Sequence, residues 1–277
     1  MNRVGIVGLG LMGGSLGLAL KKLSKKYYIL GYDHNKKHQK EAQELNLVDK
    51  IVPFQEIEKC DIIILTIPVD AIIETIKKLE GRVSPKTTII DFGSSKAKIS
   101  ESIPKNLRKN VVTAHPMTGT EKFGPKASLD ELYTNKIMVV CDIAKSGSIQ
   151  KKIALELFKD IKSKVVFMDA KEHDRHAAFI SHMPHAVSFS IANSVMKQED
   201  AKNIVALAGG GFKSMSRIAK SSPSMWEDIF RQNRENLLEA IEAFQKELDM
   251  CKEMIEKNEW DKLHKWMSKA NSLHDIL

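Results

Sequence analysis

A glycine-rich turn near the N-terminus constrains the fold more than any other feature of the sequence. A short apolar run, Arg3–Val7, leads into Gly8, Gly10 and Gly13 in a G-x-G-x-x-G pattern, and Ser15–Leu23 reads as an apolar helix. The glycines permit a tight turn and close approach of the backbone to a ligand, while the helix N-terminus offers N–H groups to an anion. Strand, glycine turn and helix in this order predict a dinucleotide-binding, Rossmann-type domain.

The second predicted strand supports this interpretation. Tyr28–Tyr32 is followed by Asp33, 20 residues after Gly13, where an acid is expected to bind the ribose hydroxyls of the adenosine half. A carboxylate there favours NAD and repels the 2′-phosphate of NADP, although Lys36 and Lys37 leave NADP open as the weaker alternative. The expected cofactor-binding residues are Gly8, Gly10, Leu11, Met12, Gly13 and Asp33.

Strands and helices continue to alternate after this point. Helices are expected at residues 68–79 and 148–161, and the unbroken apolar run at 61–66 is typical of a buried parallel strand. Further strands are expected at residues 50–52, 88–91, 111–114, 136–141 and 164–167. The fold class predicted for residues 1–168 is an α/β Rossmann-type domain.

A histidine follows the strand predicted at residues 111–114. Pro116 is expected to stop the strand at His115, and ligands bind at the carboxyl ends of strands in open α/β sheets. An imidazole with an unperturbed pKa near ~6.5 suits proton handling, although an ordinary surface-loop histidine is the alternative. Ser94 and Ser95 lie in a turn at the same sheet edge, where they would cap the next helix or, alternatively, face a ligand.

From residue 169 to 277 the pattern is helical throughout. Pro184 is expected to kink a helix, and His182 and His185 flank that break. At 100° per residue, His173 and His176 fall opposite His182 and His185. Neither pair has an obvious third ligand, so no metal site is predicted.

The last part of the chain carries a seam of apolar residues. Gly209–Gly211 predict a glycine loop, and Pro223 is expected to begin a helix that carries Trp226. The seam alternates spacings of four and three, which suits packing on a partner helix, with ordinary core as the alternative. Its members are Leu237, Ile241, Phe244, Leu248, Cys251 and Ile255.

Composition narrows the classes of partner. The net charge of +8 comes from lysines scattered in short pairs, without aromatic interleaving, so no nucleic-acid partner is expected. Cys60, Cys141 and Cys251 lie far apart in apolar segments, which indicates reduced thiols and a cytoplasmic location. No membrane span is predicted, because the uncharged stretch Val4–Leu20 contains six glycines and suits the strand–turn–helix unit better.

Five motifs in order give the sequence a family resemblance. They are Gly8-x-Gly-x-x-Gly13, Gly93-Ser94-x-Lys96, His115-Pro-Met-x-Gly-Thr-Glu121, Ser181-His-x-Pro-His185, and Gly209-Gly-Gly-Phe-Lys213 with Arg217-Ile-Ala-Lys220. Over essentially its whole length the chain resembles the prephenate dehydrogenase family. The resemblance implies NAD-dependent oxidative decarboxylation of prephenate in tyrosine biosynthesis, with a helical dimerisation domain at residues 169–277 and a homodimer.

The resemblance also implies roles for individual residues. Neutral His115 would accept a hydrogen bond from the C4 hydroxyl of prephenate, and Ser94 would orient both groups. Arg217 would bind a substrate carboxylate, since its planar fork suits one better than lysine does. The other implied substrate contacts are His185 at the side-chain end, Lys213, Trp226 reaching over from the second subunit in relatives, and Glu121 as a gate. Position 214 is Ser where some relatives have an acid, which leaves its role open.

Three alternatives stay open. Arogenate dehydrogenase differs only in an amino group on the substrate. A β-hydroxyacid dehydrogenase shares the two-domain plan and uses a helical-domain lysine, to which Lys213 bears a faint likeness, but the His115-Pro-Met motif argues against it. A non-enzymatic NAD sensor would not need His115, Ser94 and Arg217 together. Tyrosine is expected as a feedback inhibitor, because it shares ring and side chain with the substrate.

Overall fold

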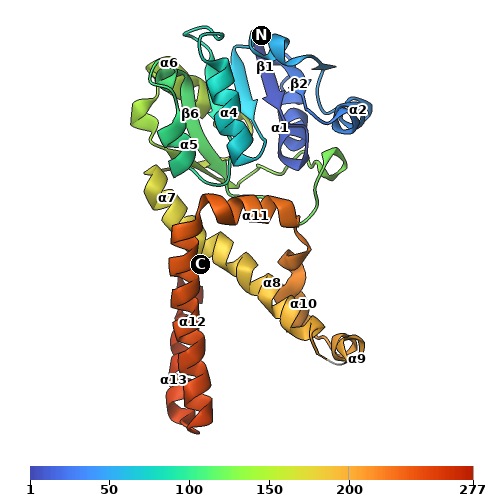
Figure 1. The fold of residues 1–277 in the computed structure, drawn as a ribbon. Coiled ribbons are helices and arrows are strands. Elements are labelled where there is room, and N and C mark those ends of the chain that lie inside the picture. Colours follow the sequence, from blue (N-terminus) through green and yellow to red (C-terminus); the bar gives the residue numbers. More distant parts are fainter. Residues whose placement is uncertain (199, 277) are drawn as a thin grey trace. The chain divides into compact units, whose positions relative to one another are not determined.

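The computed structural model describes residues 1–198 and 200–276, and Glu199 and Leu277, both in the predicted helical part, lie outside the described residues. The chain divides into two compact units, Met1–Asn233 and Arg234–Leu277 (Figure 1). The domain boundary predicted after Met168 falls inside the first unit and stays a prediction.

An eight-stranded sheet forms the centre of the first unit. Its order is β3-β2-β1-β4-β5-β6-β7-β8, and every neighbouring pair is parallel except β6 and β7. The strands are β1 (Asn2–Val7), β2 (Tyr27–Tyr32), β3 (Lys50–Ile51), β4 (Ile62–Leu65), β5 (Thr88–Asp91), β6 (Val111–Pro116), β7 (Ile137–Cys141) and β8 (Lys164–Met168). The predicted Rossmann-type fold is confirmed.

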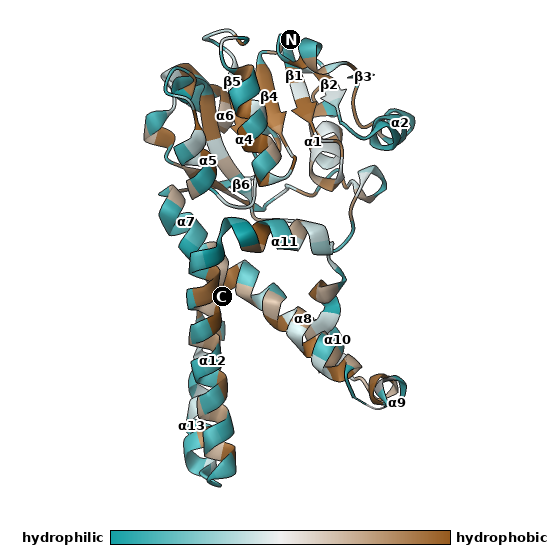
Figure 2. Ribbon diagram, in the orientation of Figure 1, coloured by the Kyte–Doolittle hydropathy of each residue, from teal (hydrophilic) through white to brown (hydrophobic). Residues whose placement is uncertain are grey.

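Helices cover both faces of this sheet. Ile62 and Ile64 of β4 belong to the core beneath α1 and α6, whereas Ile63 and Leu65 belong to the core beneath α4, because successive side chains of a strand point to opposite faces. In Figure 2 the central strands are brown and α2 is teal, as this packing requires. The helices are α1 (Leu11–Lys21), α2 (Lys36–Glu44), α3 (Phe54–Ile57), α4 (Val69–Leu79), α5 (Ala97–Ser102) and α6 (Ser148–Asp160).

Beyond β8 the described part of the first unit is helical. The helices are α7 (Ala170–Ala177), α8 (Met183–Met196), α9 (Ala201–Ala206), α10 (Gly210–Ser216) and α11 (Pro223–Gln232). The break predicted at Pro184 is a π-helical segment, Ala178–His182, between α7 and α8. Since a π-helical turn holds more residues than an α-helical one, the α-helical projection that put His173 opposite His182 does not apply across this segment.

Three local predictions are corrected. β6 does not stop at His115 but runs through Pro116, because the antiparallel partner β7 pairs with both residues. Neither Ser94 nor Ser95 caps α5, since its N-cap is Lys96 and the carboxylate of Asp174 accepts the backbone N–H groups of Lys96 and Ala97. Gly209–Gly211 do not form a loop, because Gly209 is the N-cap of α10 and the next two glycines begin that helix.

The second unit is a helical pair. α12 (Arg234–Glu256) and α13 (Trp260–Asn271) pack together, with the Trp266 indole donating to Glu247 at 2.7 Å, and a 3₁₀ turn follows at Ser272–Asp275. Two members of the predicted seam, Leu248 and Ile255, are about half exposed on a single chain. No helix in the described residues is both long and apolar enough to cross a membrane.

Candidate active site

The glycine turn has the geometry that a dinucleotide requires. Gly8 has a φ of +94°, a left-handed conformation that favours glycine, and a Cβ on Gly13 would lie 1.8 Å from the Gly8 carbonyl oxygen. At Gly10 an added Cβ would meet nothing within 4 Å. α1 begins at Leu11, earlier than predicted, so the free N–H groups of its first turn belong to Leu11, Met12 and Gly13. This tight turn faces open space, as pyrophosphate binding needs.

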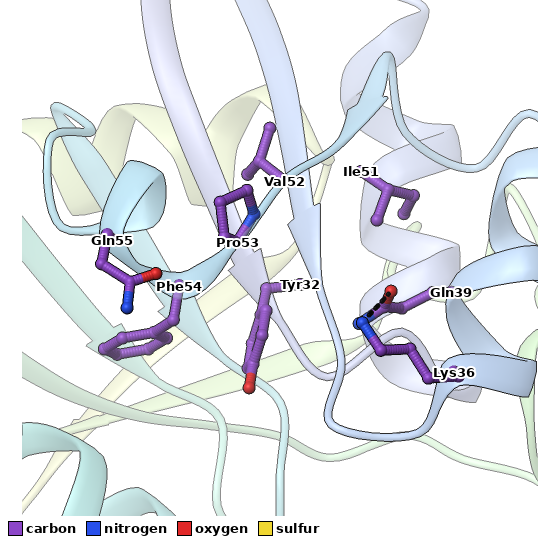
Figure 3. A pocket seen from close by; sticks show the side chains of 8 residues that line it. All are labelled: Tyr32, Lys36, Gln39, Ile51, Val52, Pro53, Phe54 and Gln55. Atoms are coloured by element: carbon purple, nitrogen blue, oxygen red, sulfur yellow. Dashed lines mark hydrogen bonds between the residues drawn. The ribbon is translucent and has the colours of Figure 1, made fainter.

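Asp33 directly follows β2, and its neighbour Tyr32 lines a cavity of about 420 Å³ (Figure 3). Its buried carboxylate accepts the N–H of Leu9 at 2.8 Å and that of Asn35 at 2.8 Å, which ties the acid to the glycine turn. The cavity is lined by Tyr32, Lys36, Gln39, Ile51, Val52, Pro53, Phe54 and Gln55. Sequence reasoning missed most of this lining. A largely apolar cavity next to the ribose acid suits the adenine ring.

His115 lies near the C-terminal end of β6, within a network of polar side chains. Its Nδ1 lies 2.8 Å from Nε2 of His173, and Nδ1 of His173 lies 2.8 Å from a carboxylate oxygen of Asp174. Both partners come from α7, whose N-cap Asp169 accepts the N–H groups of Lys171 and Glu172. His115 is half-buried as a residue, and because His173 contacts its Nδ1, Nε2 is the nitrogen left for a ligand.

The surroundings of His115 keep its imidazole neutral. Burial is the main cause that lowers its pKa well below the usual value of 6.5, and the nearby His173, Lys96 and His182 lower it further. Lys96 is fully buried and donates to a carboxylate oxygen of Asp91 and, at 2.8 Å, to the carbonyl of Ala114. A neutral imidazole can accept a hydrogen bond, which is the property that the family resemblance implies for His115.

A second group of predicted residues gathers around α8 and α11. Arg217 lies 3.7 Å from Glu121 in an exposed ion pair, and His185 stacks on Trp226 with ring centroids 3.5 Å apart. Nδ1 of His185 donates to the carbonyl of Ser181 at 2.8 Å. Burial lowers the pKa of His185, and nearby Arg217 adds to that effect. Trp226 therefore packs within its own chain.

Two predicted site residues, Ser94 and Lys213, make no hydrogen bond or ion pair with the other predicted site residues in the described chain. Ser94 is half-buried and makes no hydrogen bond to His115 within the described chain, since His173 occupies Nδ1 of that ring. Lys213 is exposed, and its ammonium makes no ion pair with any described residue.

Three residues of the network around His115 were not among the predicted site residues: Lys96, His173 and Asp174. Lys96 belongs to the Gly93-Ser94-x-Lys96 motif, whereas His173 and Asp174 lie outside the five motifs. Their signal was present as adjacent imidazole and carboxylate groups in the first helix after the last strand, but the α-helical projection turned His173 away from His182.

His182 connects the two groups. Its ring is nearly perpendicular to that of Trp226, with centroids 6.1 Å apart, and burial lowers its pKa to about 4. Asn233 places its side-chain amide 3.1 Å from Nδ1 of His182 and donates to the Asp174 carbonyl at 2.6 Å. Hence His115 and the residues around Trp226 belong to one continuous site.

Comparisons with known proteins agree with this geometry. The sequence model "Prephenate dehydrogenase, nucleotide-binding domain" matches residues 16–167, and "Prephenate dehydrogenase, dimerization domain" matches residues 169–269. A prephenate dehydrogenase from Lactococcus lactis is 32% identical, over 90% of this chain and 70% of the relative.

Two solved structures are also similar. Prephenate dehydrogenase from A. aeolicus, in complex with hydroxyphenyl propionate and NAD+, aligns with a TM-score of 0.92 and 34% identity over 100% of this chain and 98% of the other. Arogenate dehydrogenase from Synechocystis aligns with a TM-score of 0.81 and 26% identity over 99% of each chain. The chain belongs to the prephenate dehydrogenase family and is an NAD-dependent oxidoreductase.

Proposed function

We propose that this protein catalyses the NAD-dependent oxidative decarboxylation of prephenate to 4-hydroxyphenylpyruvate. The observation that carries the proposal is His115, a neutral imidazole at the end of β6 with Nδ1 held by His173 and Nε2 left for a ligand. Two similar proteins, from L. lactis and A. aeolicus, are named for prephenate.

The reaction needs an acceptor at the C4 hydroxyl of prephenate. NAD, when bound by the glycine turn and Asp33, supplies the hydride acceptor. As hydride departs from C4 and CO2 from the ring, the hydroxyl oxygen would give electron density to C4 and its O–H would become more acidic, and His115 Nε2 would stabilise that change by accepting the hydrogen bond of the hydroxyl. Any proton that His115 takes returns to the same oxygen, because the product carries a hydroxyl there. Ser94, half-buried in the turn after β5, would orient the hydroxyl.

The exposed group would hold the two substrate carboxylates. Arg217 offers a planar pair of donors, and its ion pair with Glu121 must open for a carboxylate to bind, which makes Glu121 the gate. Lys213 adds positive field. His185 would contact the side-chain end of the substrate. Trp226, on which His185 is stacked, would line the substrate pocket.

The proposal also covers a homodimeric assembly, a cytoplasmic location and inhibition by tyrosine. The half-exposed seam residues Leu248 and Ile255 of α12 support a homodimer, as does the match of residues 169–269 to a dimerization domain. Cys60, Cys141 and Cys251 are free thiols, which supports a cytoplasmic location. Tyrosine would inhibit by occupying the ring and side-chain sites. A tyrosine titration that leaves the rate unchanged would remove this last point.

The test compares prephenate with arogenate in parallel, following NADH absorbance with NAD as cofactor. We expect kcat/KM to be at least about tenfold higher for prephenate, a transition-state preference of ~1.4 kcal/mol. The reverse preference would make the protein an arogenate dehydrogenase with the same fold and site. Absence of reduced cofactor with either substrate, and with NADP in place of NAD, would contradict the proposal.

A His115→Ala variant tests the catalytic group. Loss of the acceptor should lower kcat by roughly 10²–10⁴-fold, the usual contribution of a positioned acid or base. The Kd for NAD, measured by fluorescence titration, should stay unchanged because His115 lies in β6, whereas the glycine turn follows β1. A variant that still forms NADH at the wild-type rate would remove His115 from the mechanism.

A further inference from the structure

We propose that His173 and Asp174 act as positioning residues that fix the tautomer of His115, so that its Nε2 always presents a lone pair to the substrate hydroxyl. The functional consequence rests on the proposed oxidation of prephenate, whereas the tautomer itself does not. A carboxylate, an imidazole and a second imidazole stand in line, joined by two contacts of 2.8 Å.

The direction of each hydrogen bond follows from the Asp174 end. One oxygen of its carboxylate accepts the backbone N–H of Lys96 at 2.7 Å, and the other accepts that of Ala97 at 2.9 Å. Three donors thus converge on this group once Nδ1 of His173 is counted, which suits an ionised carboxylate that can only accept. Nδ1 of His173 therefore carries its proton and donates.

The remaining protons follow in sequence. In a neutral His173 the other nitrogen, Nε2, is an acceptor, so Nδ1 of His115 must carry the proton that lies between the two rings. Neutral His115 then has its lone pair on Nε2. A second proton on His173 would reverse this order, but it would place a cation in a buried site that already holds the ammonium of Lys96.

The side chains of His173 and Asp174 are held in place by burial and by hydrogen bonds. The side chains of His173 and Asp174 are 3% and 4% exposed. Asp174 joins α7 to the start of α5 through its carboxylate, and its backbone carbonyl accepts from the amide of Asn233. A ring that is held from behind by fixed groups cannot flip or change tautomer without breaking a buried hydrogen bond.

The other tautomer would defeat the chemistry. If Nδ1 of His115 were the acceptor, Nε2 would offer an N–H to a hydroxyl group whose own proton has to be drawn away. The carboxylate of a Ser-His-Asp triad does the same work for its histidine, and replacing it by an amide there leaves the geometry intact but gives the wrong tautomer. Here a second imidazole stands between the carboxylate and the catalytic ring.

The first experiment reads the tautomer directly, without substrate. The full-length enzyme with ¹⁵N-labelled histidine is studied by long-range ¹H–¹⁵N correlation at neutral pH, and His115 is assigned by its loss in His115→Ala. We expect Nδ1 of His115 to be protonated and Nε2 to be the unprotonated nitrogen. The opposite assignment, or an equal mixture of the two tautomers, would overturn the proposal even if the enzyme oxidises prephenate.

Variants test the consequence for catalysis. His173→Leu removes the acceptor but leaves Asp174 free to cap α5, and we expect kcat to fall at least about tenfold while KM for prephenate and Kd for NAD change less than about twofold. His176→Gln is the matched control, because His176 lies on the same helix with an exposed side chain, and it should change nothing.

The outcomes separate this inference from the proposed function. A wild-type enzyme that is inactive on prephenate but shows the expected tautomer would contradict the function alone. If the wild-type enzyme is active and its His173→Leu variant keeps its kcat within about twofold, the positioning role of His173 and Asp174 alone would be overturned.

Discussion

The two halves of the site differ in how their charges are held. Beneath His115, the groups that matter are buried and each has a fixed partner, as the fully buried pair of Lys96 and Asp91 shows. Around the predicted substrate anchor, Arg217 is 60% exposed, and its only ion-pair partner within the described chain is Glu121, at 3.7 Å. The buried half is already ordered before substrate binds, whereas Arg217 in the exposed half can exchange Glu121 for a substrate carboxylate.

This difference matches what each half has to do. Charge that develops in a transition state is best met by groups that are already oriented, because reorganising them costs energy at the moment of reaction. A substrate carboxylate, in contrast, has to displace whatever occupies the arginine. We therefore expect stability and rate to depend on the buried half of the site, and substrate affinity on the exposed half.

Removing Lys96 should have the largest effect on stability. Lys96→Met would leave the Asp91 carboxylate buried without its cation, and breaking a buried pair in this way costs about 3–5 kcal/mol. Urea unfolding measures the loss. Lys98→Met is the matched control, because Lys98 lies two residues away, 50% exposed and 3.3 Å from Asp70, where a pair contributes about 0–1 kcal/mol. Equal losses in both variants would erase the distinction between buried and exposed halves.

Removing Arg217 should lower affinity rather than stability. A hydrogen bond to a charged group contributes about 1.5–3 kcal/mol, so Arg217→Gln should raise KM for prephenate roughly 10–150-fold and leave urea unfolding nearly unchanged. Arg231→Gln serves as the control, since Arg231 is 58% exposed and pairs with Asp70 and Asp228 away from the site. If kcat fell instead of KM rising, Arg217 would belong with the groups that stabilise the transition state.

Removing the Glu121 partner of Arg217 should lower KM for prephenate, a smaller effect than that of removing Arg217 and opposite in sign. An exposed ion pair is worth at most about 1 kcal/mol, so Glu121→Gln should lower KM for prephenate up to about fivefold with kcat unchanged. Added salt should shrink the difference between variant and wild type, because it screens exposed charges. Glu101→Gln, which removes the exposed partner of Lys171, should show no such change. A rise in KM would mean that Glu121 contacts substrate rather than gating it.

The sequence was informative wherever local rules decide the structure. Gly8 and Gly13 can be assigned from their spacing alone, because a left-handed φ and a close backbone approach leave no other residue possible. The strands could be read from apolar runs, and His115 from its place after one of them. These features depend on neighbours in the chain, so the sequence displays them.

The sequence was uninformative where distant segments meet. Asp174 caps a helix 77 residues earlier in the chain, so nothing near Ser94 or Ser95 could reveal that their capping role was taken. The π-helical segment before Pro184 shifted the phase of the histidines, and no propensity rule marks such a segment. The network under His115 is therefore a property of tertiary structure.

The smallest effect concerns pH. An imidazole acts as an acceptor only while neutral, and the pKa of His115 is lowered well below 6.5, chiefly by burial. Activity should therefore be lost only as the pH falls through that lowered value, so kcat/KM should change less than about twofold between pH 7.5 and 6.5. A half-maximal point at the ordinary histidine value would show that the ring is hydrated like a surface histidine. The buried half of the site would then be as adjustable as the exposed one.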